Sequence, residues 1–95
     1  MTAMMNEPTK YELVATAPDG GKFLAGYVRI PSKSAMVRMI RQNGQAWADV
    51  TGATQFTIEG KGRMGWVLTL GAWKIRFSQR TKLEASRAPL PFFKA

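Results

Sequence analysis

The sequence predicts a small α+β domain in the order ββ-α-βββ, with a mostly antiparallel sheet and one amphipathic helix packed on it. Three observations predict this fold: a turn signal near residue 19, an amphipathic stretch after residue 32, and a second turn signal at residue 71 with one apolar face. The 95 residues, 45% of them apolar, suffice for one hydrophobic core without disulfides. We predict a flexible segment at residues 1–9, a single domain at 10–83 and an extended tail at 84–95.

The first turn signal lies between two stretches that are typical of strands, residues 10–17 and 22–30. Asp19-Gly20 accepts the positive φ angles of a two-residue hairpin loop. The pairs expected across this hairpin are Tyr11 with Val28, Leu13 with Gly26, and Ala15 with Leu24.

A helix is predicted to follow this hairpin. Either serine of the segment 31–34 can cap it, because a serine hydroxyl satisfies a free backbone N–H at a helix start. The helix should run over about residues 33–43 and end at Gly44, which tolerates the left-handed conformation. Its apolar side is formed by Met36, Val37, Met39 and Ile40. Residues 45–54 are expected to form a connection or a short strand anchored by Trp47 and Val50.

The second half of the chain is predicted to be a three-stranded meander. Gly71-Ala72 fits a two-residue hairpin loop, and Gly60-Lys61-Gly62 fits a three-residue loop that brings Glu59 opposite Arg63. The pairs expected across the last hairpin are Leu70 with Trp73, Leu68 with Ile75, and Trp66 with Phe77. Both turns place the apolar residues on one face, together with Phe56, Ile58 and Met64.

The net charge points to a polyanionic partner. Fourteen Lys and Arg residues against six Asp and Glu give a formal charge of +8, and nucleic acid is the densest common polyanion. The polar face of the last hairpin collects the residues that we expect to contact phosphates: Arg63, Lys74, Arg76 and Arg80, with Lys61 at the loop tip and Lys82 just beyond. The competing interpretation is that any solvent-exposed face of a sheet carries polar residues, and that the basic residues here have no binding role.

Two further groups are candidates. Arg38 and Arg41 on the polar side of the helix would extend the basic surface, although any solvated helix carries such residues. Phe23 and Tyr27 share a predicted face with Arg29, where exposed rings would stack on unpaired bases. Rings at such positions more often cover a core.

Catalysis is not expected from this composition. The chain has no histidine and no cysteine, so it lacks the usual general base, the thiol nucleophile and the favoured zinc ligands. Its acids are scattered, with no spacing that predicts a carboxylate pair. We therefore expect no enzyme activity, metal or cofactor. No apolar stretch approaches the roughly 20 residues of a membrane span, and no leader is evident, so we expect a cytoplasmic location and no membrane partner.

These observations favour a non-enzymatic DNA- or RNA-binding accessory protein that acts mainly through phosphate contacts. The alternative is a small protein-binding inhibitor or adaptor, of the kind that phages and mobile elements direct against host complexes, docking on an acidic surface. A homodimer through a sheet edge or the tail is a further option. The tail segment 89–93, Pro-Leu-Pro-Phe-Phe, would dock on a partner or fold back over an edge of its own sheet.

Overall fold

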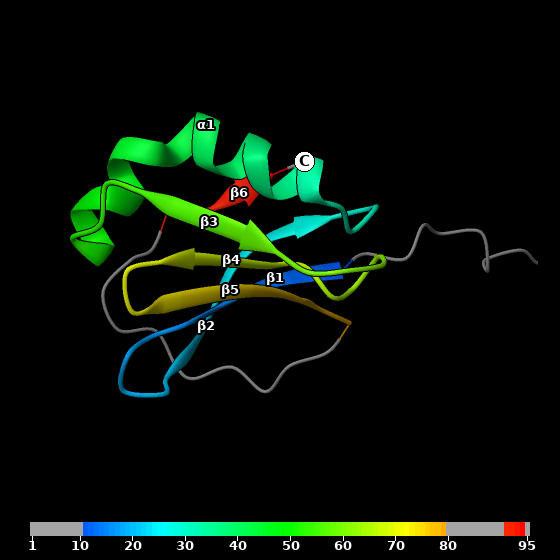
Figure 1. Cartoon of the computed structure of the whole chain (residues 1–95), viewed down its shortest axis with the longest axis horizontal. Coiled ribbons are helices and arrows are strands. Elements are labelled where there is room, and N and C mark those ends of the chain that lie inside the picture. The colour runs from blue at the N-terminus through cyan, green and yellow to red at the C-terminus, as the bar shows by residue number, and fades with distance from the viewer. Residues whose placement is uncertain (1–10, 80–90, 95) are drawn as a thin grey trace, which may run out of the picture.

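The computed structural model describes residues 11–79 and 91–94. Its elements are β1 (Tyr11–Thr16), β2 (Lys22–Val28), α1 (Lys33–Thr51), β3 (Phe56–Glu59), β4 (Val67–Leu70), β5 (Trp73–Ser78) and β6 (Phe93–Lys94). The six strands form one sheet in the order β3-β4-β5-β1-β2-β6, and α1 lies across one face of it (Figure 1). The first five strands pair antiparallel with their neighbours. The predicted α+β fold and the ββ-α-βββ order are confirmed.

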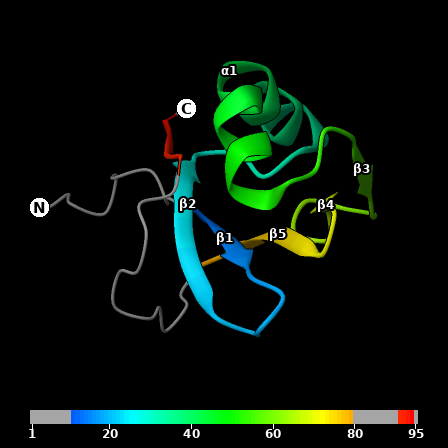
Figure 2. The ribbon, with the colours of Figure 1, turned by 90° about the vertical axis from the view of Figure 1, so that its left-hand side faces the viewer.

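The hydrophobic core lies between α1 and the face of the sheet that curves around it (Figure 2). The helix contributes four buried side chains, Ala35, Met36, Met39 and Trp47. The strands contribute Leu13, Ala15, Ala25, Val28, Leu68, Leu70, Ile75, Phe77 and Phe93. Full burial of one large aliphatic or aromatic side chain contributes about 1.5–3 kcal/mol, so this contact between helix and sheet is the main source of stability. The face turned away from α1 carries no helix in the part of the chain that the structure describes.

The turn of the β1–β2 hairpin differs from the prediction. Its loop has three residues, 18–20, rather than two. The N–H of Ala17 donates to the carbonyl of Gly21 at 2.8 Å, and the N–H of Gly20 donates to the carbonyl of Ala17 at 2.9 Å. Gly20 has a φ of 92°, the left-handed conformation that closes a three-residue hairpin loop.

The extra loop residue shifts the pairing next to the turn by one position, so Ala15 faces Phe23 and not Leu24. A bulge at Ala25 then restores the register, and the other two predicted pairs are confirmed: Leu13 with Gly26 and Tyr11 with Val28. Because a shift of one residue turns a strand over, Phe23 and Tyr27 lie on opposite faces of the sheet.

Helix α1 is longer than predicted. It begins as expected, with Ser32 as the N-cap, whose Oγ accepts a hydrogen bond from the N–H of Ala35 at 3.1 Å. The expected end near residue 43 is instead a kink, where Asn43 has a φ of −128° and a ψ of 20°. The helix then resumes, because Gly44 is not left-handed and the next turn buries Trp47. It ends at Gly52, which has a φ of 73°.

Two pairs of the β4–β5 hairpin are as predicted: Leu68 pairs with Ile75 and Leu70 with Trp73. The third predicted pair, Trp66 with Phe77, is not part of the ladder, because β4 begins at Val67. The β3–β4 connection does not have the predicted register. Glu59 pairs with Val67 rather than Arg63, so the loop spans residues 60–66. This shift of four positions is even, so the apolar residues of β3 keep the predicted face. The longer loop is tight, because a Cβ at Gly60 would lie 2.8 Å from the Cα of Trp66.

The end of the tail adds a sixth strand. Phe93 and Lys94 pair in parallel with Gly26 and Tyr27 of β2, and Phe93 is 1% exposed in the core. The sequence allows the tail either to dock on a partner or to fold back over an edge of its own sheet. Phe93 and Lys94 fold back in this way, along the edge of β2. The predicted flexible segment and the first part of the predicted tail lie outside the described residues.

Candidate nucleic-acid interface

The outer face of the sheet, by which we mean the face turned away from α1, carries aligned rows of side chains. Cross-strand partners share a face, so the register of four strand pairs fixes each row. The first row, read from β2 to β3, is Lys22, Thr16, Lys74, Thr69 and Thr57. It contains two ammonium groups and three hydroxyls in one line across the sheet.

Two further rows follow on this face. The second is Leu24, Val14, Arg76, Val67 and Glu59. The third is Tyr27, Glu12 and Ser78. The second row is mostly apolar, with Val14 buried and Leu24 and Val67 half-buried. Arg76 is its exposed cation.

The cations of the first two rows form what we call the cation row: Lys22, Lys74 and Arg76. All three are exposed, and none forms an ion pair within residues 11–79 and 91–94. Lys22 and Lys74 lie two strands apart, or about 10 Å at the usual strand spacing. Spaced, unpaired cations with hydroxyl donors between them suit the oxygens of successive phosphates.

The acids of the outer face lie away from the first row. Glu59 sits on the edge strand β3, two strands from Arg76. Glu12 is four residues along β1 from Thr16, which places it at the opposite end of the face. The strand cations are therefore concentrated at one end of the face, with Lys22 beside the β1–β2 turn and Lys74 beside the β4–β5 turn; the acid at this end is Asp19, in the 18–20 loop.

Lys22 was not among the predicted site residues. It joins Lys74 because β1 lies between β2 and β5, so that Thr16 pairs with both lysines. The pairing of β1 with β5 joins two hairpins that are far apart in the sequence, so it cannot be predicted from either hairpin alone. The only local signal was that Lys22 begins a strand next to a turn.

Several predicted site residues do not lie in the cation row. Lys61 and Arg63 are exposed in the 60–66 loop, which meets β4 at Val67, the partner of Arg76 and two residues along β4 from the partner of Lys74. The prediction that Arg63 shares a strand face with Lys74 is wrong, because β4 begins at Val67. Arg80 and Lys82 lie outside the described residues.

The helix arginines occupy the other layer of the molecule. Arg38 and Arg41 are exposed on α1, whose buried side faces the sheet from the side opposite the cation row (Figure 1). One flat ligand on the outer face cannot contact both groups. They do not extend the basic surface of the sheet as predicted.

The two predicted stacking rings are separated. Phe23 pairs with Ala15 on the helix side, is 8% exposed and contacts Trp73 at a centroid distance of 6.4 Å. It is part of the interior, so it presents no free ring to a base. Tyr27 lies on the outer face, 38% exposed, and contacts Phe92.

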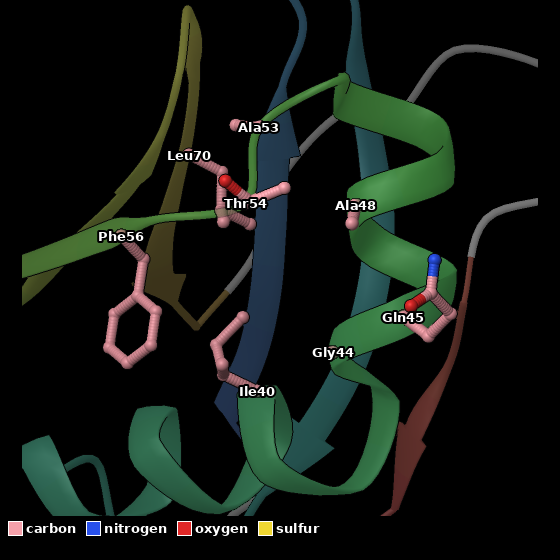
Figure 3. Close-up of a pocket in the computed structure, with 8 residues that line it drawn as sticks. All are labelled: Ile40, Gly44, Gln45, Ala48, Ala53, Thr54, Phe56 and Leu70. Atoms are coloured by element: carbon pink, nitrogen blue, oxygen red, sulfur yellow. The ribbon is translucent and has the colours of Figure 1, made fainter.

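A pocket of about 230 Å³ opens on the other layer, between the second half of α1 and the start of β3 (Figure 3). It is lined by Ile40, Gly44, Gln45, Ala48, Ala53, Thr54, Phe56 and Leu70. No titratable side chain lines it, and the amide of Gln45 donates to Asp49 at 2.9 Å. The pocket is smaller than the roughly 300–1,000 Å³ of common ligand sites, and its lining offers no acid–base chemistry.

Other kinds of site find no support in the described residues. Over residues 11–79 and 91–94, no three acidic side chains come together as a metal site would require. No helix there is both long and apolar enough to cross a bilayer. No protein-family model matches the chain, and no curated protein or solved structure matches it.

Proposed function

We propose that this protein is a non-enzymatic, cytoplasmic nucleic-acid-binding accessory protein that contacts phosphates through the outer face of its sheet. The observation that carries the proposal is the cation row: Lys22 and Lys74 flank the hydroxyl of Thr16, Arg76 lies in the next row, and all three are exposed and form no ion pair among the described residues. The formal charge of +8 on the whole chain supports it, because the long-range field attracts polyanions before contact.

The contacts available on this face are of the kind that fix position and not sequence. Lysine and threonine donate to phosphate oxygens of any nucleotide, and the shallow face has no element that enters a groove. The affinity is therefore electrostatic and only weakly dependent on sequence. Three neutralised phosphates predict a slope of about −2.7 in log K against log salt on duplex DNA, at about −0.9 per phosphate.

The test is a binding titration with a generic duplex and a single strand over a series of salt concentrations. The double variant Lys74→Glu/Arg76→Glu should weaken binding to both ligands regardless of sequence. The matched control is Arg38→Glu/Arg41→Glu, which makes the same charge change on the helix layer and should weaken binding far less. If the wild type shows no binding at low salt, the proposal is wrong.

A protein partner with an acidic surface is the competing outcome. Edge strand β3 favours a protein partner, because Phe56 there is 41% exposed and β3 pairs with β4 alone among the described strands. Affinity purification with and without nuclease separates the two functions. Partners that disappear with nuclease support nucleic-acid binding, whereas a stoichiometric protein that stays bound supports an inhibitor or adaptor.

A further inference from the structure

Two aromatic rings meet on the outer face, at the end opposite Lys22 and Lys74. Tyr27 and Phe92 contact each other in an edge-to-face arrangement, with centroids 5.8 Å apart and ring planes at 66°. They are 38% and 41% exposed. We propose that this pair, which we call the aromatic pair, stacks on unpaired bases, so that the preferred ligand is single-stranded nucleic acid. The proposal rests on the proposed function and specifies its ligand.

Burial of the next residue, Phe93, positions Phe92 on the outer face. Successive residues of an extended chain point to opposite faces. Phe93 enters the core on the helix side and pairs with Gly26, so Phe92 is turned outward against Tyr27. The end of the chain thus supplies one of the two rings. Because the anchor is buried, the exposed ring is positioned in advance, which lowers the entropy cost of stacking.

The aromatic pair and the cation row divide the outer face into two ends. Lys22 and Tyr27 pair with Thr16 and Glu12, which are four residues apart on β1, a rise of about 13 Å at 3.3 Å per residue. Half-buried Leu24 lies between them. Glu12 pairs with Tyr27, and its carboxylate repels phosphate from the aromatic end. The backbone of a strand is therefore drawn to Lys22, Lys74 and Arg76, and its bases are left to lie over Leu24 and the rings.

A duplex cannot use this arrangement. The bases of a duplex are paired and stacked inside the double helix, so an exposed ring on the outer face of the sheet reaches only the sugar–phosphate backbone. A single strand presents the faces of its bases, and such stacking tolerates any sequence because every base has a π face. Platforms of this kind combine a basic track with exposed aromatics, and the outer face has both.

The first experiment needs no mutation. The wild type is titrated with an oligothymidine, an abasic oligonucleotide of equal length and a duplex, all at equal phosphate concentration and salt. Stacking predicts binding to the oligothymidine at least about 5-fold tighter than to the abasic strand, the lower bound for one base on an aromatic ring. If the oligothymidine and the abasic strand bind equally well, the inference is overturned while the proposed function stands. If none of the three binds, the proposed function itself fails.

The second experiment assigns the residues. Tyr27→Leu/Phe92→Leu should remove the preference for the oligothymidine over the abasic strand, while duplex affinity and its salt slope stay within about twofold. Phe56→Leu is the matched control, since Phe56 is also 41% exposed but lies on the helix side of edge strand β3. If the double variant keeps the preference, the rings do not carry it. Thermal melting of each variant confirms that the fold is intact, and the first experiment remains decisive if it is not.

Discussion

Gly26 lies directly against the backbone of Phe93. A side chain at this glycine would place its Cβ 2.9 Å from the Cβ of Phe93 and closer still to the carbonyl oxygen of Phe93. The approach is this close because β2 and β6 pair in parallel at this position, with Phe93 buried beneath it. The missing side chain of Gly26 therefore lets β6 pair with β2.

Gly26→Ala should displace β6 and expose Phe93. We expect a loss of about 1–3 kcal/mol in the free energy of unfolding, because the clash is with backbone atoms that cannot rotate away. Urea denaturation measures the loss. Gly44→Ala is the control: apart from its chain neighbours and the backbone of its own helix, no atom lies within 4 Å of the added Cβ, and helical alanine should stabilise by about 0.5–1 kcal/mol. Gly26 also has a φ of 157°, which an alanine rarely adopts, so equal stability of the two variants would show that neither this conformation nor the contact with Phe93 holds in solution.

Ser32 is expected to contribute to stability as the cap of α1. Its Oγ accepts from the N–H of Ala35, so Ser32→Ala should cost about 1 kcal/mol by urea denaturation. Ser34, two residues on, is exposed inside the first turn, and its hydroxyl accepts no hydrogen bond from the described residues. Ser34→Ala should therefore be neutral or slightly stabilising. The reverse ranking would place the cap at the other serine that the sequence allows.

Local sequence predicted the register and the faces of the β4–β5 hairpin, but it placed Phe23 on the wrong face of the β1–β2 hairpin. At residues 71–72 the glycine starts the turn and alternating apolar residues flank it on both sides, so one register satisfies both signals. At residues 18–20 the same turn chemistry fits two or three loop residues, and a bulge at Ala25 absorbs the difference. The β3–β4 register is shifted by four from the prediction, yet Ile58 keeps its face because the shift is even.

The candidate site depends on the order of the strands in the sheet, which local sequence does not predict. Lys22 and Lys74 are 52 positions apart in number (74 − 22), and only the placement of β1 between β2 and β5 brings them into one row. The same holds for Phe92, whose ring meets Tyr27 only because β6 pairs with β2. The charge balance predicted a basic surface, and long-range strand order decided which residues form it.

Lys22→Ala tests the position of the cation row. Removing one phosphate contact should weaken duplex binding at low salt by about 3- to 10-fold and reduce the salt slope by about 0.9. Arg38→Ala removes one charge from the helix layer and should leave the slope unchanged. Titrations of both variants at three or more salt concentrations give the comparison. If Arg38→Ala changes the slope and Lys22→Ala does not, the nucleic acid lies on the helix and not on the sheet.

Glu12→Gln should strengthen nucleic-acid binding without destabilising the fold. Its Oε1 is buried with no hydrogen-bond partner among the described residues, so the carboxylate gains little from its surroundings there. A negative charge about 10 Å from a phosphate costs about 0.4 kcal/mol in water, so its removal should tighten binding about twofold. Glu59→Gln makes the same charge change on exposed edge strand β3, two strands from Arg76, and should have a smaller effect. A drop in the melting temperature of Glu12→Gln alone would show that Glu12 is held by a cation in solution, in which case the outer face is less positive than the cation row implies.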